Sequence, residues 1–186
     1  MKKLHVVGAV AILALAAMVL IGCDQPTSNP GNNPSNPGDS WTKVETVDGL
    51  EGVWKSSVTQ ASSGNQITVV TTITYPATEG NLTWVREVKG DPDTGGSTKP
   101  DEETFSKGEI ETLLKNGQVP VSIFGIVGYM EVNADKTKLK VTGTLKEDDS
   151  NWGDVKSLVG MSTFEGDMKI TSEPTQITVE QYYNKQ

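Results

Sequence analysis

The chain has 186 residues, with 16 basic and 24 acidic side chains and a formal net charge of −8. This acidic balance opposes binding to nucleic acid through a basic surface. The only histidine is His5 and the only cysteine is Cys23, so the rest of the chain lacks the side chains for histidine-dependent triads, cysteine nucleophiles and the usual zinc sites. Carboxylates, lysine, serine and tyrosine remain, but adjacent acids such as Glu102-Glu103 are typical of solvated charge. We therefore expect no enzyme and no cofactor.

The first 22 residues have the pattern of a secretory signal. Lys2 and Lys3 precede sixteen apolar or glycine residues, 6–21, fewer than the roughly 20 that span a bilayer. The run closes in Leu20-Ile21-Gly22-Cys23, which resembles the lipobox of bacterial lipoproteins. The resemblance implies cleavage before Cys23 and a diacylglyceryl group on its sulfur. An uncleaved membrane anchor, or a signal peptide with an incidental cysteine, is the alternative.

Residues 23–40 are predicted to be the lipidated cysteine and a linker. The segment has four prolines, and Ser-Asn-Pro-Gly occurs twice, at Ser28 and Ser35. Such a composition cannot offset the entropy of ordering. We expect the linker to hold a domain of residues 41–186 off a membrane of the cell envelope, outside the cytoplasm. Loss of Lys2 and Lys3 with the signal leaves 14 basic against 24 acidic side chains, a net charge of −10.

The segment from Trp41 to Gln186 alternates apolar and polar residues with a period of two, which indicates antiparallel strands with one solvated face. A capping pattern from Ser106 to Glu109, with Ile110, Leu113 and Leu114 at helical spacing and Gly117 as a stop, predicts one helix. A further helical turn is expected near 154–159, while Trp41 and Trp152 have linker and loop contexts. Strands are expected near 52–60, 65–75, 81–90, 101–106, 125–133, 138–147, 161–171 and 175–184.

Short strands in series favour an all-β fold, an eight-stranded antiparallel up-and-down barrel with one short helix. A β-sandwich is the alternative. Gly128, Gly143 and Gly166 on the expected inner faces indicate bends, or leave volume for a ligand.

The first expected strand carries Gly52-Val53-Trp54, which resembles the Gly-x-Trp signature of lipocalins. The resemblance covers the order of elements from about 50 to 185 and implies that Trp54 closes one end of the barrel. The chain departs from the family in two respects. It has no late arginine over the tryptophan and no helix after the last expected strand.

Arg86, the only arginine, shares a strand face with Trp84. If that face is the interior, the guanidinium needs a partner, because a buried charge is costly alone. It could anchor a ligand carboxylate or phosphate. It could equally form a structural ion pair with a glutamate, stack on Trp54 or Trp84, or lie in solvent. The candidate ligand-binding residues are Arg86, Trp84, Met130, Phe164 and Tyr183.

The loop from Asp91 to Glu102 partly matches a calcium-binding loop. Asp91, Asp93 and Glu102 occupy positions 1, 3 and 12, with Gly96 at position 6. Position 5 is Gly95, which has no side-chain oxygen, and no helix is expected before it. We therefore expect a loop without a metal, with these three acids as the only calcium candidates.

Two functions remain open at this point. In the first, the barrel of a monomeric, lipid-anchored envelope protein binds a small apolar or amphipathic ligand. In the second, the barrel is filled and serves as a scaffold for surface interaction or adhesion, with no small-molecule ligand.

Overall fold

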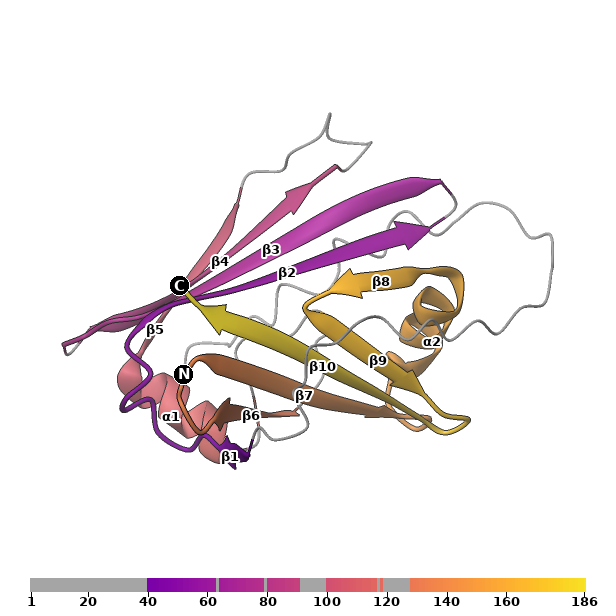
Figure 1. Ribbon diagram of the computed structural model, residues 1–186. Helices are drawn as coiled ribbons and strands as arrows, with labels where there is room; N and C mark the ends of the chain where they lie inside the picture. Colours follow the sequence, from indigo (N-terminus) through magenta and orange to yellow (C-terminus); the bar gives the residue numbers. More distant parts are fainter. Residues whose placement is uncertain (1–39, 63, 79, 91–99, 117, 119–127) are drawn as a thin grey trace, which may run out of the picture.

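The computed structural model describes residues 40–62, 64–78, 80–90, 100–116, 118 and 128–186, which form one antiparallel sheet of ten strands with two short helices (Figure 1). The all-β class is confirmed. None of the described helices is long and apolar enough to cross a membrane. The strands are β1 (Trp41–Lys43), β2 (Gly52–Ser62), β3 (Asn65–Tyr75), β4 (Asn81–Lys89), β5 (Asp101–Ser106), β6 (Gly128–Asn133), β7 (Lys138–Lys146), β8 (Thr163–Gly166), β9 (Met168–Ser172) and β10 (Gln176–Lys185). The helices are α1 (Lys107–Lys115) and α2 (Trp152–Met161).

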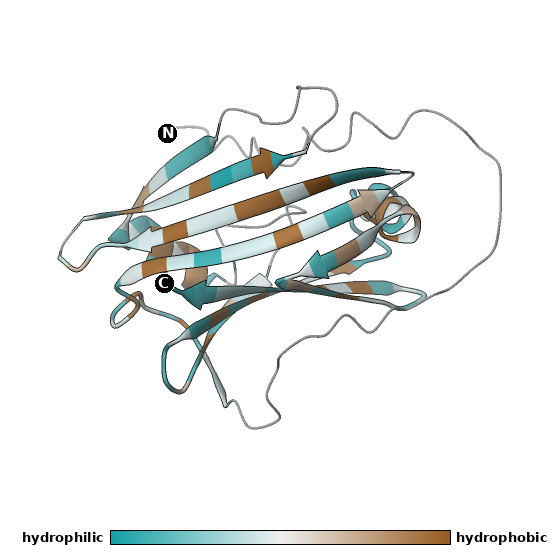
Figure 2. Ribbon diagram, turned by 45° about the horizontal axis from the view of Figure 1, so that its top comes forward, coloured by the Kyte–Doolittle hydropathy of each residue, from teal (hydrophilic) through white to brown (hydrophobic). Residues whose placement is uncertain are grey.

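The alternation read from the sequence sets which side chains face the interior. On β10, Ile177, Val179, Gln181 and Tyr183 are buried, and the residues between them are only half-buried. Figure 2 shows the same alternation as apolar and polar bands along β2 and β3. Every predicted strand overlaps a strand of the structure.

The sheet is not closed into a barrel in the described part of the chain. Its order is β1-β6-β7-β10-β2-β3-β4-β5, so β1 and β5 form the two edges. From β2 to β5, neighbours in sequence are neighbours in the sheet, as predicted. The outer edge of β6 is taken by β1, which the sequence did not predict and which pairs Trp41 with Asn133. No pairing joins β1 to β5 among the described residues, so the eight-stranded barrel is not confirmed. All ten described strands belong to one hydrogen-bonded sheet, not to the two separate sheets of a sandwich.

The sheet forks between β2 and β10. These strands pair through only two residue pairs, Asn184 with Lys55 and Lys185 with Trp54. Farther along, β2 pairs with β8 and β10 pairs with β9, so that β8 and β9 enter the fork as a hairpin (Figure 1). The single strand predicted over 161–171 is therefore wrong. Gly166, at φ +93°, turns the chain where only glycine fits easily.

Asp167, at the tip of this hairpin, ties the two sides of the fork together. Its backbone N–H donates to Ser57 O at 2.9 Å, and its carbonyl accepts from Tyr182 N at 2.8 Å. Its carboxylate accepts from Ser57 N at 2.8 Å and from Asn184 Nδ2 at 3.2 Å. Four hydrogen bonds from one residue thus replace the missing pairing between β2 and β10.

Buried apolar side chains form two clusters on the inner face. The first, called the Trp54 cluster, contains Val44, Leu50, Trp54, Ile73, Tyr75, Leu82, Trp84, Ile110, Leu114, Met130, Leu139, Val141 and Tyr183. The second, called the Trp152 cluster, contains Val58, Leu145, Trp152, Val155, Met168, Ile177 and Val179. Helix α1 packs into the first and α2 into the second, so each helix covers one end of the inner face.

Helix α1 confirms the predicted capping box. Ser106 Oγ accepts a hydrogen bond from Glu109 N at 3.3 Å, and the Glu109 carboxylate accepts from Ser106 N at 2.9 Å. The predicted stop, Gly117, lies outside the described residues. Helix α2 is longer than the single turn predicted near 154–159.

Two tryptophans lie in settings that differ from the prediction. Trp152 is not in a loop, since it begins α2 and is only 9 % exposed in its cluster. Trp41 belongs to β1, where its ring meets Tyr182 edge-on and lies 4.8 Å from Lys140 Nζ. The residues next to each tryptophan in the sequence are mostly polar. Its contacts with distant residues therefore could not be predicted from the sequence.

Candidate functional site

A row of polar side chains crosses the apolar inner face of the sheet. Ser56 on β2 lies directly opposite Thr71 on β3, and Thr71 lies opposite Arg86 on β4. All three are buried. The row continues to Asp101 on β5, and from β10 the side-chain amide of Gln181 donates to Ser56 Oγ at 3.0 Å. We call Gln181, Ser56, Thr71, Arg86 and Asp101 the polar row.

Arg86 is held inside the fold by Asp101. The Arg86 side chain is 9 % exposed, its Nε donates to Asp101 Oδ2 at 3.2 Å, and its Nη2 forms an ion pair with the same oxygen. The Arg86 guanidinium carbon also lies 5.8 Å from the centre of the Trp84 ring, within range of a cation–π contact. Burial rules out the solvated setting for Arg86. Arg86 thus forms the structural ion pair that was one of the expected alternatives, but with Asp101 rather than with a glutamate.

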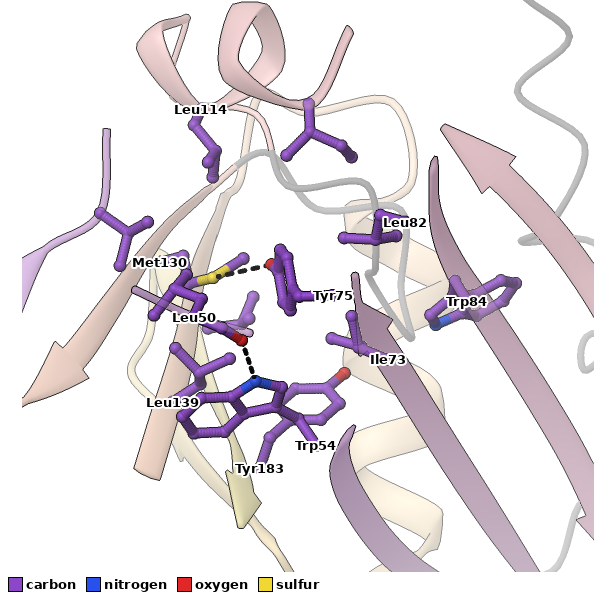
Figure 3. Packing of buried hydrophobic residues seen from close by; sticks show 13 residues of the cluster. Leu50, Trp54, Ile73, Tyr75, Leu82, Trp84, Leu114, Met130, Leu139 and Tyr183 are labelled. Carbon is purple, nitrogen blue, oxygen red and sulfur yellow. Dashed lines mark hydrogen bonds between the residues drawn. The ribbon is translucent and has the colours of Figure 1, made fainter. Parts of the chain in front are cut away.

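Four large aromatic side chains of the Trp54 cluster lie beside the polar row. Trp54 and Trp84 lie on either side of Ile73, as its partners on β2 and β4, and Tyr75 is two residues farther along β3. Tyr183 is two residues beyond Gln181 on β10. Figure 3 shows Trp54, Tyr75 and Tyr183 close together, with Trp84 on the other side of Ile73.

In two of these aromatic side chains, Trp54 and Tyr75, the polar atom has a hydrogen-bond partner. Trp54 is fully buried, its Nε1 donates to Leu50 O at 2.8 Å, and Lys185 Nζ lies 5.2 Å from its ring centre. The Tyr75 hydroxyl donates to Met130 Sδ at 3.7 Å. Burial raises the pKa of Tyr75, so this hydroxyl keeps its proton at all physiological pH values.

The other two have buried polar atoms without a hydrogen-bond partner. These are Trp84 Nε1 and Tyr183 Oη, which find no acceptor among the described residues. Burial, the nearby Tyr75 and the Asp167 carboxylate all raise the pKa of Tyr183, so this hydroxyl also remains protonated and is a donor. A buried polar group without a hydrogen-bond partner lowers the stability of the fold by about 1–3 kcal/mol. A bound molecule that forms a hydrogen bond with either atom would therefore stabilise the protein.

The structure brings together four of the five predicted ligand-binding residues. Arg86 and Trp84 are neighbours on β4, and Met130 and Tyr183 belong with Trp84 to the Trp54 cluster. Phe164 lies apart, because β8 carries it to the edge of the Trp152 cluster. Trp54 belongs to a cluster with residues from both halves of the chain.

The remaining predicted sites have less structural description. Glu102 is exposed on β5, opposite Val85, and the other two calcium candidates, Asp91 and Asp93, lie outside the described residues. Cys23 and the lipobox also lie outside them. The lipidation and calcium predictions thus remain predictions.

Several residues of the site escaped the sequence analysis. Ser56, Thr71 and Gln181 are small or neutral, and nothing in their own strands marks them as special. Thr71 follows the same odd-numbered spacing as Val69 and Ile73, which was the available signal for an inward position. That these residues form one row depends on the register between strands, which local sequence does not specify.

An open hollow of about 500 Å³ lies elsewhere, lined by Lys146, Glu147, Asp148, Thr175 and Gln176. It shares no residue with the polar row. Comparisons with protein-family models, with curated proteins and with solved structures found no match for this chain.

Proposed function

We propose that the chain is a bacterial lipoprotein, anchored by Cys23 in a membrane of the cell envelope, whose β-domain binds a small amphipathic molecule. The apolar clusters would bind the apolar part of the ligand, and the donors beside the polar row would form hydrogen bonds with its polar group. The observation that carries this proposal is the pair of buried, unpartnered polar atoms, Trp84 Nε1 and Tyr183 Oη, within the Trp54 cluster.

The proposal retains a lipocalin-like relationship. The sequential order from β2 to β5, and the position of Trp54 at the start of that series, support it. In this reading, β1 and α1 occupy the place where a closed barrel would join β5 to β6.

The alternative function is a scaffold for surface interaction without a small-molecule ligand. The complete burial of Trp54, Met130, Leu139 and Tyr183 favours it, because these side chains already fill much of the inner face. Native mass spectrometry of the mature lipoprotein, purified from its own cells and gently released from detergent, separates the two. We expect a retained molecule of a few hundred daltons besides the lipid anchor. A mass equal to that of the lipidated polypeptide alone would favour the scaffold.

The anchor itself is testable by Cys23→Ser. We expect the variant to remain uncleaved and to incorporate no fatty-acid analogue during metabolic labelling, since the thiol that carries the diacylglyceryl group is gone. A Ser28→Ala variant, in the linker, is the matched control and should label as the wild type does. Labelling of the Cys23→Ser protein would overturn the lipobox assignment.

A further inference from the structure

The two unpartnered atoms are both hydrogen-bond donors, and this restricts what could bind them. An indole N–H can only donate. The phenol hydroxyl of Tyr183 is held in its protonated form by burial. The equivalent atoms of Trp54 and Tyr75, in the same cluster, have acceptors in Leu50 O and Met130 Sδ. The cluster therefore satisfies the polar atoms of Trp54 and Tyr75 and leaves the donors of Trp84 and Tyr183 without an acceptor in the described part of the chain.

The two donors belong to the same part of the interior. Trp84 lies directly opposite Ile73 on the neighbouring strand, and Tyr183 is in the same buried cluster. In Figure 3, the indole nitrogen of Trp84 and the hydroxyl of Tyr183 are on the sides of their rings that face Ile73. An acceptor group bound over Ile73 would meet donors from β4 and from β10.

The charges around these donors disfavour an anionic group. The positive charge of Arg86 already has a carboxylate partner in Asp101. The Asp167 carboxylate lies close enough to contribute to the raised pKa of Tyr183. A second carboxylate placed among these groups would be buried without a matching cation, which is costly. An uncharged acceptor avoids that cost.

Resting on the proposed function, we propose that the ligand carries an uncharged acceptor oxygen, as in a ketone or an ester. This oxygen accepts hydrogen bonds from Trp84 Nε1 and Tyr183 Oη. The aliphatic part of the ligand lies on the Trp54 cluster, next to Ile73 and Leu82.

Three probes of equal chain length test this: 2-octanone, octanoate and octane. Their affinities are measured by displacement of the neutral dye N-phenyl-1-naphthylamine from residues 23–186 carrying Cys23→Ser, expressed without the signal segment and studied in the absence of detergent. Because a neutral hydrogen bond contributes about 0.5–1.5 kcal/mol, we expect 2-octanone to bind about 10-fold more tightly than octane, and more tightly than octanoate at pH 8.

Tyr183→Phe removes one donor with no change in ring volume. It should weaken 2-octanone about 3- to 10-fold and leave octane within about 2-fold. Trp84→Phe should act in the same direction, whereas the control Tyr129→Phe, at an exposed tyrosine of β6 outside the Trp54 cluster, should keep the preference. Equal binding of the three probes, tighter binding of octanoate, or a ketone preference that survives in both variants overturns the proposal. Failure of the dye and of all three probes to bind would instead overturn the proposed function, and this proposal with it.

Discussion

Trp54→Ala is expected to lower the free energy of unfolding by about 3–5 kcal/mol, the largest loss among the four tryptophans. The fully buried indole packs on Ile73 and Leu139, and its N–H is bonded to Leu50 O. Alanine would leave a large cavity and an unpartnered carbonyl. Since domains of this size are stable by roughly 5–15 kcal/mol, the variant would be close to unfolding at physiological temperature.

The other tryptophans serve as graded controls in the same urea titration. Trp152→Ala removes a buried side chain from the smaller cluster and should cost about 3 kcal/mol, rather than the small loss expected from a loop residue. Trp41→Ala removes a half-buried ring in contact with Tyr182 and Lys140 and should cost about 1 kcal/mol. If Trp54→Ala were as mild as Trp41→Ala, the Gly52-Val53-Trp54 motif would not close the interior.

Gly166→Ala is expected to cost about 2–4 kcal/mol and to loosen the fork between β2 and β10. A Cβ at this position would lie 2.4 Å from Ser57 O, and φ is +93°. The left-handed backbone alone costs a non-glycine residue about 1–2 kcal/mol. The clash adds a similar amount, because the carbonyl of Ser57 is fixed by its bond to Asp167 N.

Gly64→Ala is the matched control for this variant. Gly64 has a similar φ of +86°, but no described atom lies within 4 Å of its added Cβ. It should therefore show only the backbone penalty of about 1–2 kcal/mol. Hydrogen exchange should accelerate at the amides of Asp167 and Tyr182 in Gly166→Ala and stay unchanged in Gly64→Ala. Equal losses and unchanged exchange would mean that the hairpin tip does not hold the fork.

The strands and the capped helix could be predicted because their signals are local. The alternation on β10 and the Ser106–Glu109 capping pattern each lie within about ten consecutive residues. The predictions that failed concern pairings between residues that are far apart in the sequence. The short strand β1 has only three residues, and its pairing with β6 makes it an edge of the open sheet. No local pattern in Trp41–Lys43 reveals a partner at residues 131–133.

The site was predicted in part for the same reason. Arg86 and Trp84 were identifiable because a lone arginine between apolar neighbours is unusual on one strand face. Their connection to Thr71, Ser56 and Gln181 depends on the register of four strands, and the fork at Asp167 brings Gln181 to Ser56. The sequence also suggested that Arg86 could bind an anionic ligand. Because Arg86 already has a carboxylate partner in Asp101, the proposed ligand is instead uncharged.

The indole region of a ¹H–¹⁵N spectrum tests the central claim most directly. The four tryptophans give four indole signals, which single tryptophan-to-phenylalanine variants assign. On addition of 2-octanone to residues 23–186 carrying Cys23→Ser and expressed without the signal segment, the account predicts that the Trp84 Nε1–H signal moves downfield and exchanges more slowly with water. The Trp54 signal, whose proton already bonds Leu50 O, should stay in place. An unmoved Trp84 signal at saturating 2-octanone would contradict the account.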